Sequence, residues 1–144
     1  MSQYDKQLKA FTVLYRATTA TQDATKKGVQ QSDLNITEFA VMELLYHKGE
    51  QPIQIIGKKV LIASSSITYV IDKLEKKELV YRHSCPTDRR VTFAALSEKG
   101  RNLMESIFPQ HSQKIAQIFE VLSEDELNIL TQLLKRVGHH ASKL

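Results

Sequence analysis

The sequence contains little cysteine, glycine and proline, and it contains no tryptophan. Its one cysteine, Cys85, can form neither an intrachain disulfide nor a cysteine-rich structural metal site. It has five glycines and three prolines, with 42% apolar and 25% charged residues, a composition typical of a folded chain. No apolar run approaches the roughly 18 residues that a membrane span requires, and the polar N-terminus lacks the apolar region of a signal peptide. We therefore expect a folded, cytoplasmic protein with no membrane partner.

Residues that could support catalysis or bind a metal are scattered along the chain. The five histidines form no cluster with Asp or Glu at metal-ligand spacing, so we predict no metal and no cofactor. There is no glycine-rich phosphate loop and no order of Ser, His and Asp that indicates a nucleophilic triad. Cys85 and His83 would share one face of a strand, which leaves a thiol-dependent enzyme as an alternative. We expect a protein that is not an enzyme.

Positive charge is concentrated in the middle of the chain. Residues 53–101 carry ten Lys and Arg but five Asp and Glu, a net charge of +5, whereas the whole chain carries +4. This asymmetry favours a polyanionic partner for the middle segment, and an ordinary solvated surface is the alternative.

Apolar periodicity predicts two helices in the first third of the chain. Residues 4–31 have apolar side chains at helical spacing, although a cluster of threonines should weaken the middle of this helix. A second helix covers about 36–47, with Asn35 or Thr37 as its N-cap and Gly49 at its end.

A short helix and a longer polar helix follow. Pro52 lies in the first turn of the short helix, and the longer one begins at Ala63 or Ser64 and continues to about residue 77. Apolar residues of the longer helix recur at positions i, i+3, i+4 and i+7, which predicts one buried stripe and one polar face.

The remaining sequence predicts a two-stranded hairpin and two helices. The segments LVYRHS and RVTFAAL are β-rich and flank the turn CPTD. Ser97 caps the next helix, which Pro109 should kink or break. Ser123 and Glu126 form a capping box for the last helix. Its apolar stripe consists of Leu127, Leu130, Leu133, Leu134 and Val137.

This order of elements predicts a mainly α fold with some β structure (α+β), in which residues 36–101 form a winged helix-turn-helix. A polar helix of this kind can enter the major groove of DNA. The residues expected to contact bases or phosphates from it are Ser64, Ser65, Ser66, Thr68, Tyr69, Lys73 and Lys76. At the hairpin tip, Arg90 would enter the minor groove, Asp88 would orient it, and Arg89 would bind phosphate.

Three stretches carry a family resemblance: LNITEFAVMELLYHKG, SSSITYVIDKLEKKELVYR and PTDRRVTFAALSEKG. The chain resembles the MarR family of bacterial transcription regulators over nearly its whole length. The last stretch matches the family's wing signature at Asp88, Arg90, Leu96, Ser97, Lys99 and Gly100. The resemblance implies a homodimer on a pseudo-palindromic operator in double-stranded DNA, with residues 1–35 and 102–144 as the helical dimerisation layer.

The resemblance also implies a repressor that is released by a small ligand or by cysteine modification. The chain looks most like the branch that responds to quinones and related aromatic electrophiles. A ligand site between the layer and the DNA-binding lobe would include Phe11, Tyr15, Phe39, Met42 and Tyr46. Cys85 is the candidate redox-sensing residue, because neighbouring arginines favour the reactive thiolate. A winged helix that binds another protein instead of DNA is the alternative function.

Overall fold

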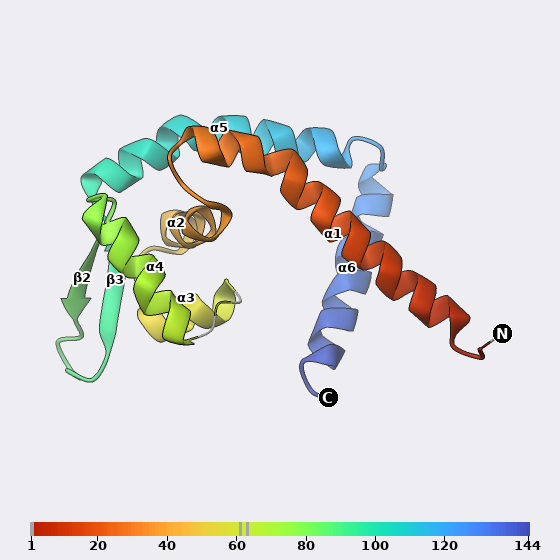
Figure 1. Cartoon of the computed structure of the whole chain (residues 1–144), viewed down its shortest axis with the longest axis horizontal. Coiled ribbons are helices and arrows are strands. Elements are labelled where there is room, and N and C mark those ends of the chain that lie inside the picture. The colour runs from red at the N-terminus through yellow and green to blue at the C-terminus, as the bar shows by residue number, and fades with distance from the viewer. Residues whose placement is uncertain (1, 61, 63) are drawn as a thin grey trace.

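The computed structural model describes residues 2–60, 62 and 64–144, without the side chains of Ser64 and Ser65. Its elements form a mainly α winged helix-turn-helix, as the sequence predicts (Figure 1). In chain order they are α1 (Asp5–Gln31), α2 (Ile36–Lys48), β1 (Gln51–Pro52), α3 (Ile53–Lys59), α4 (Ser64–Lys76), β2 (Val80–Ser84), β3 (Thr92–Leu96), α5 (Glu98–Phe119) and α6 (Glu124–Ala141).

Helices α1 and α5 both continue through residues that disfavour a helix. Helix α1 is continuous through its threonine cluster, where hydroxyls bond to carbonyls one turn earlier: Thr18 donates to the carbonyl of Leu14 at 2.9 Å and Thr19 to that of Tyr15 at 3.1 Å. Helix α5 likewise continues from Glu98 to Phe119 with Pro109 inside it, so of the two expected effects of this proline, a kink or a break, the break does not occur.

The start of α2 is fixed by reciprocal hydrogen bonds. The amide of Glu38 donates to Asn35 Oδ1 at 2.7 Å, and the amide of Asn35 donates to Glu38 Oε1 at 3.0 Å. Asn35 is therefore the N-cap, and the alternative cap Thr37 lies inside the helix. At the other end Gly49 has φ of 76°, the left-handed conformation that favours glycine. The alternative α4 start at Ala63 lies outside the described residues.

The sheet has three strands in the order β1-β3-β2, one more than the hairpin predicted from the sequence. Strand β1 pairs antiparallel with β3 through Gln51 opposite Ala94 and Pro52 opposite Phe93. Proline is compatible with this position because β1 is an edge strand. Two residues are too short to show an alternating pattern, so the sequence does not reveal the strand.

The core lies in the winged lobe and is closed by the start of α5. Its fully buried side chains include Met42, Leu45, Ile56, Ile71 and Met104, from α2, α3, α4 and α5. Ile67, Val70, Ile71 and Leu74 of α4 are all buried, which confirms the stripe predicted for the polar helix and packs α4 against the lobe.

Ser97 and Gly100 of the wing signature lie at the junction between the wing and α5, and both have a structural role there. Ser97 Oγ donates to the carbonyl of Glu78 at 2.6 Å and accepts from the amide of Gly100 at 3.0 Å, so it caps α5 and binds the chain ahead of β2. A Cβ atom on Gly100 would lie 2.1 Å from the carbonyl oxygen of Leu79. Glycine is therefore required by close approach of two backbones.

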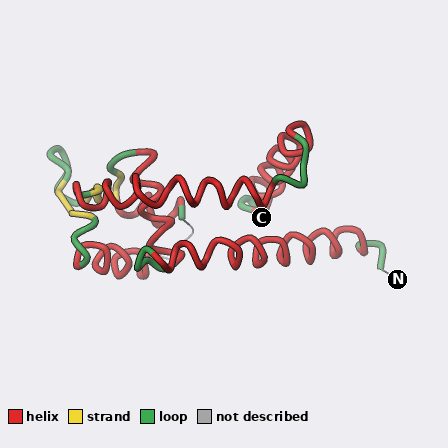
Figure 2. The backbone as a smooth tube through the Cα atoms, turned by 90° about the horizontal axis from the view of Figure 1, so that it is seen from above, coloured by secondary structure: helices red, strands yellow, loops and turns green. Residues whose placement is uncertain are grey.

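Helices α1 and α6 extend beyond the lobe, and α1 runs beside α5 in both views (Figures 1 and 2). Their apolar side chains are largely uncovered in the single chain: Phe11 is 68% exposed and Val137 is 57% exposed. No helix in the described part of the chain is both long enough and apolar enough to cross a membrane.

Candidate nucleic-acid interface

Helix α4 presents a polar face to solvent. Ile67, Ile71 and Leu74 are buried on its inner side, whereas Ser66, Thr68, Tyr69, Lys73 and Lys76 are exposed. Lys73 Nζ lies 5.2 Å from the centroid of the Tyr69 ring, so these two side chains form one cationic, aromatic patch. Ser64 and Ser65 lie in the first turn of α4, and their side chains are outside the described set.

The tip of the wing holds Arg90 in a defined orientation. Arg90 donates from Nε to Asp88 Oδ1 at 3.1 Å and from Nη2 to Asp88 Oδ2 at 3.2 Å, and its amide donates to Asp88 Oδ1 at 3.0 Å. The expected bond between the two side chains is thus present. The Arg90 side chain remains 91% exposed. It is oriented without being covered, and so is available to a ligand.

The same contact changes the acidity of Asp88. Hydrogen bonds from the side chain and backbone of Arg90 hold the pKa of the Asp88 carboxyl below its ordinary value of 3.8. The carboxylate is therefore charged throughout the neutral range. Arg89 is exposed in the same turn.

The wing and α4 open onto one surface. A groove of about 540 Å³ is lined by Thr68 of α4, Arg82 of β2, Arg90 of the wing and residues 52–55 at the start of α3. A single ligand on this side of the molecule can therefore contact the polar helix and the wing arginine together.

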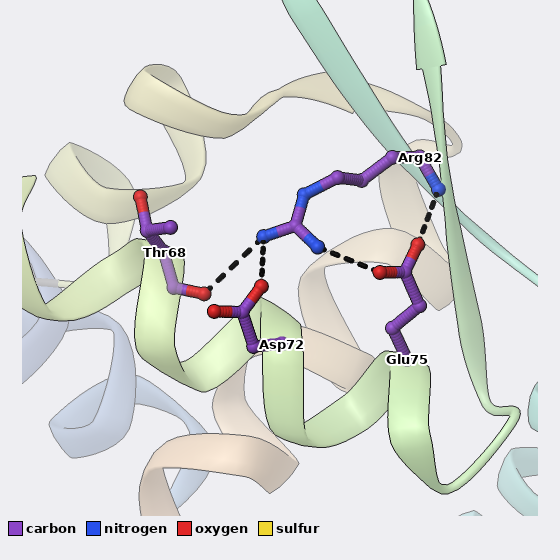
Figure 3. Close-up of polar contacts among 4 residues, drawn as sticks. All are labelled: Thr68, Asp72, Glu75 and Arg82. Carbon is purple, nitrogen blue, oxygen red and sulfur yellow. Dashed lines mark hydrogen bonds and ion pairs between the residues drawn. The ribbon is translucent and has the colours of Figure 1, made fainter.

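Arg82 bonds the wing to α4, a contact that sequence analysis missed (Figure 3). Its guanidinium donates to Asp72 at 2.6 Å, to Glu75 at 2.7 Å and to the carbonyl oxygen of Thr68 at 3.3 Å. From the sequence, Arg82 is only one of several cations near the hairpin. The sequence indicates this contact only weakly: Asp72 and Glu75 are three positions apart, so they share one face of the helix, and a basic residue follows on the next strand.

Cys85 lies just after β2, in the turn. Its Sγ is 3.3 Å from Thr87 Oγ1. Hydrogen bonds from the Thr87 side chain and from the backbone amides of Thr87 and Asp88 lower the pKa of the Cys85 thiol. The expected direction is correct, but its cause is the turn itself, and the charge of Asp88 opposes it.

His83 does not form the pair with Cys85 that a thiol enzyme would need. Its Nε2 lies 2.5 Å from Glu50 Oε2, and its ring stacks on Phe93 at 5.4 Å between centroids. The described residues contain no group of three or more His, Cys, Asp and Glu side chains that could hold a metal.

A cavity of about 300 Å³ lies between α1, α2 and α5. Of the five residues expected to bind a ligand, Phe39 lines it, whereas Met42 is fully buried in the core. Tyr46 packs against Phe108 with ring centroids 5.8 Å apart. Phe11 and Tyr15, 68% and 69% exposed, lie on the outer part of α1. In a single chain these five residues are therefore not brought together.

His111 also lines this cavity, and the sequence does not point to it. The ring of His111 lies 4.6 Å from that of Phe39, and its Nε2 lies 3.4 Å from Glu43 Oε2. Glu43 is on α2 and His111 on α5, so their proximity depends on how these helices pack and leaves no local pattern in the sequence.

A helix-turn-helix with a polar second helix, followed by a wing with an oriented and exposed arginine, defines the class of winged helix-turn-helix regulators. The model of the MarR family matches residues 34–92. Over 139 residues, 96% of each chain, the sequence is 55% identical to the HTH-type transcriptional regulator MhqR of Bacillus subtilis strain 168. The chain belongs to the MarR family, as the sequence motifs predict.

Solved structures share the fold. One is the MarR family regulator Sco3205 of Streptomyces coelicolor in complex with DNA, with a TM-score of 0.86, 21% identity and coverage of 97% of this chain and 89% of that one. Another is NadR in complex with 4-hydroxyphenylacetate, with a TM-score of 0.78, 26% identity and coverage of 86% and 88%.

Proposed function

We propose that the chain is a homodimeric, sequence-specific DNA-binding transcriptional regulator that acts as a repressor in the cytoplasm and is not an enzyme. The observation that carries this proposal is the shared surface of α4 and the wing, where Arg90 is oriented by Asp88 and yet fully accessible. Membership of the MarR family and similarity to the transcriptional regulator MhqR support it.

In this proposal each lobe contacts DNA with two elements. The hydroxyls of α4, from Ser64 to Thr68, and Tyr69 contact base edges or the backbone in the major groove. Arg90 enters the minor groove, where narrow A·T-rich sequence concentrates negative potential. Lys73, Lys76 and Arg89 bind phosphates, so affinity should fall steeply with salt.

The helical layer at residues 1–35 and 102–144 is proposed to form the dimer, and residues 36–101 the DNA-binding lobe. The uncovered apolar residues on α1 and α6 support this, because such side chains favour burial against a partner. In such a dimer the two copies of α4 would lie about 34–36 Å apart and reach successive major grooves of a pseudo-palindromic operator.

Release from DNA is proposed to follow binding of a small aromatic molecule, for which the cavity between α1, α2 and α5 is suited. Its volume of about 300 Å³ is at the lower end of ligand sites and fits a single-ring compound. Phe39 and His111 supply ring contacts, and Gln110 and Lys114 add polar groups to the lining. The cavity is bounded by helices of both the layer and the lobe, so an occupant could change the angle between them.

Thiol modification at Cys85 is the second proposed route of release. The lowered pKa of the thiol increases the fraction of thiolate that reacts with quinones or oxidants. A bulky adduct at this position, five residues before Arg90, would change the wing.

The proposal is tested by fluorescence anisotropy on the promoter region of the chain's own gene and on scrambled DNA of equal length, before and after benzoquinone. We expect tight, salt-sensitive binding to the promoter alone and release by benzoquinone. If benzoquinone still releases Cys85→Ser from the promoter, the cavity is the site of its action. If this variant stays bound, benzoquinone acts through the Cys85 thiol. Equal and weak binding to both duplexes contradicts the proposed function and favours a protein-binding module.

A further inference from the structure

Helix α4 carries two carboxylates on the side that faces the wing. Asp72 and Glu75 have side chains that are 52% and 42% exposed. Unpaired negative charges on a helix that enters a DNA groove would repel the phosphates. These two acids therefore need a compensating charge from within the protein.

Arg82 supplies that charge from β2. One guanidinium nitrogen binds Glu75 Oε1 at 2.7 Å, and the other binds Asp72 Oδ1 at 2.6 Å and the carbonyl oxygen of Thr68 at 3.3 Å (Figure 3). The backbone amide of Arg82 also donates to Glu75 Oε2 at 3.3 Å. Both carboxylates are thus bound by the same strand residue.

The geometry of these contacts fixes α4 along and around its axis. Residues 68, 72 and 75 are separated by four and three positions, so they lie on one face of the helix. Arg82 is itself fixed by its position opposite Ala94 in the sheet, and its side chain is only 24% exposed. A planar guanidinium that binds three acceptors on one helix face opposes rotation and sliding of the helix against the strand.

We propose that Arg82 is a positioning residue for DNA recognition. It neutralises Asp72 and Glu75, and it holds α4 at a fixed angle to the wing. In each half of the operator, α4 can then contact the major groove while Arg90 contacts the neighbouring minor groove. Because its donors are used within the protein, Arg82 contributes to sequence selectivity without binding phosphate. The inference rests on the proposed function, since it assigns a role within DNA recognition.

The test compares Arg82→Lys and Arg82→Met with the wild type and with Arg101→Lys. Lysine keeps the charge but cannot bind three acceptors as a planar guanidinium does. Arg101 is exposed at the start of α5, so the same exchange there is a matched control. Dissociation constants are measured on promoter and scrambled duplexes at several salt concentrations, and thermal unfolding shows that each variant is folded.

We expect the ratio of promoter to scrambled affinity to fall at least threefold in Arg82→Lys and about tenfold or more in Arg82→Met. The salt dependence of Arg82→Lys should equal that of the wild type, and Arg101→Lys should leave the ratio unchanged. A wild-type ratio in Arg82→Lys overturns the proposal, because charge alone would then suffice. Equal weakening on both duplexes in Arg82→Met, with the ratio unchanged, also overturns the proposal, because Arg82 would then contribute charge but no selectivity.

A measurement without DNA separates this inference from the proposed function. Amide exchange followed by ¹H–¹⁵N NMR should be faster along α4 in Arg82→Lys than in the wild type, because the helix loses two of its contacts with β2. Unchanged exchange overturns the positioning role whatever the DNA titrations show. If the wild type binds no duplex while the exchange differs, the proposed function fails and the structural role of Arg82 stands.

Discussion

Replacing Arg90 by alanine removes the one wing side chain that is both oriented and fully accessible. Because the side chain is 91% exposed and bonded only within its own turn, its loss should leave the fold and the thermal unfolding temperature essentially unchanged. A side chain that reads a groove contributes about 1–3 kcal/mol, so each wing should account for about fivefold or more in operator affinity, and the two wings of a dimer for at least about tenfold. A dimer loses two such contacts.

The assay is a gel-shift or anisotropy titration on the operator, with Arg89→Ala as the matched control. Arg89→Ala removes the same charge one residue away, and as a phosphate contact it should weaken operator and scrambled DNA alike. Arg90→Ala should weaken the operator more than scrambled DNA. An unchanged operator affinity in folded Arg90→Ala would refute the assignment of this residue to the minor groove.

Three further predictions concern the wing and its junction with α5. Gly100→Ala should lower the free energy of unfolding in urea by about 3 kcal/mol or more, because a Cβ there would lie 2.1 Å from a backbone oxygen. An NMR titration should give Asp88 a pKa below 3.8, and in Arg90→Ala this pKa should return toward 3.8. The contact between Asp88 and Arg90 therefore stabilises the folded state above pH 3.8, and this stabilisation is lost as the pH falls through the lowered pKa. Alkylation of Cys85 at pH 7 should be slower in Thr87→Val, because the hydrogen bond that lowers the thiol pKa is removed.

Two of these predictions have a control in the chain. Gly28→Ala on α1 meets no atom within 4 Å, so it should leave the urea midpoint unchanged or raised. Glu126 in the α6 capping box also has a lowered pKa, through bonds from Ser123, and should be insensitive to Arg90→Ala. Unaltered alkylation in Thr87→Val, or a urea midpoint of Gly100→Ala equal to that of the wild type, would contradict the geometry described for the turn and the junction.

The elements that the sequence predicts well are those whose cause is local. Residues within a turn or two of one another predict the capping box at Ser123, the terminating Gly49 and the buried stripe of α4. They also narrow the N-cap of α2 to Asn35 or Thr37. The Asp88–Arg90 contact is equally local and was predicted for the same reason.

The features that the sequence does not predict join distant segments. Arg82 meets Asp72 and Glu75 only after the chain has turned from α4 into β2, and His111 meets Glu43 only after α5 packs on α2. A count of positive charges treats every Lys and Arg in the same way. It therefore does not distinguish Arg82, which is bonded within the protein, from Arg90, which is available to DNA. Phe11 and Tyr15 likewise do not line the cavity, because they lie earlier on α1 than Ala24, the first of the α1 residues that do.

The central claim is that α4 and the wing contact one DNA site together. Hydrogen–deuterium exchange with mass spectrometry, with and without saturating operator duplex, tests it most directly. We predict protection in residues 64–76 and in residues 85–91, with little change in the outer part of α1. Protection confined to α4 would remove the wing from recognition, and protection in neither segment would contradict the account.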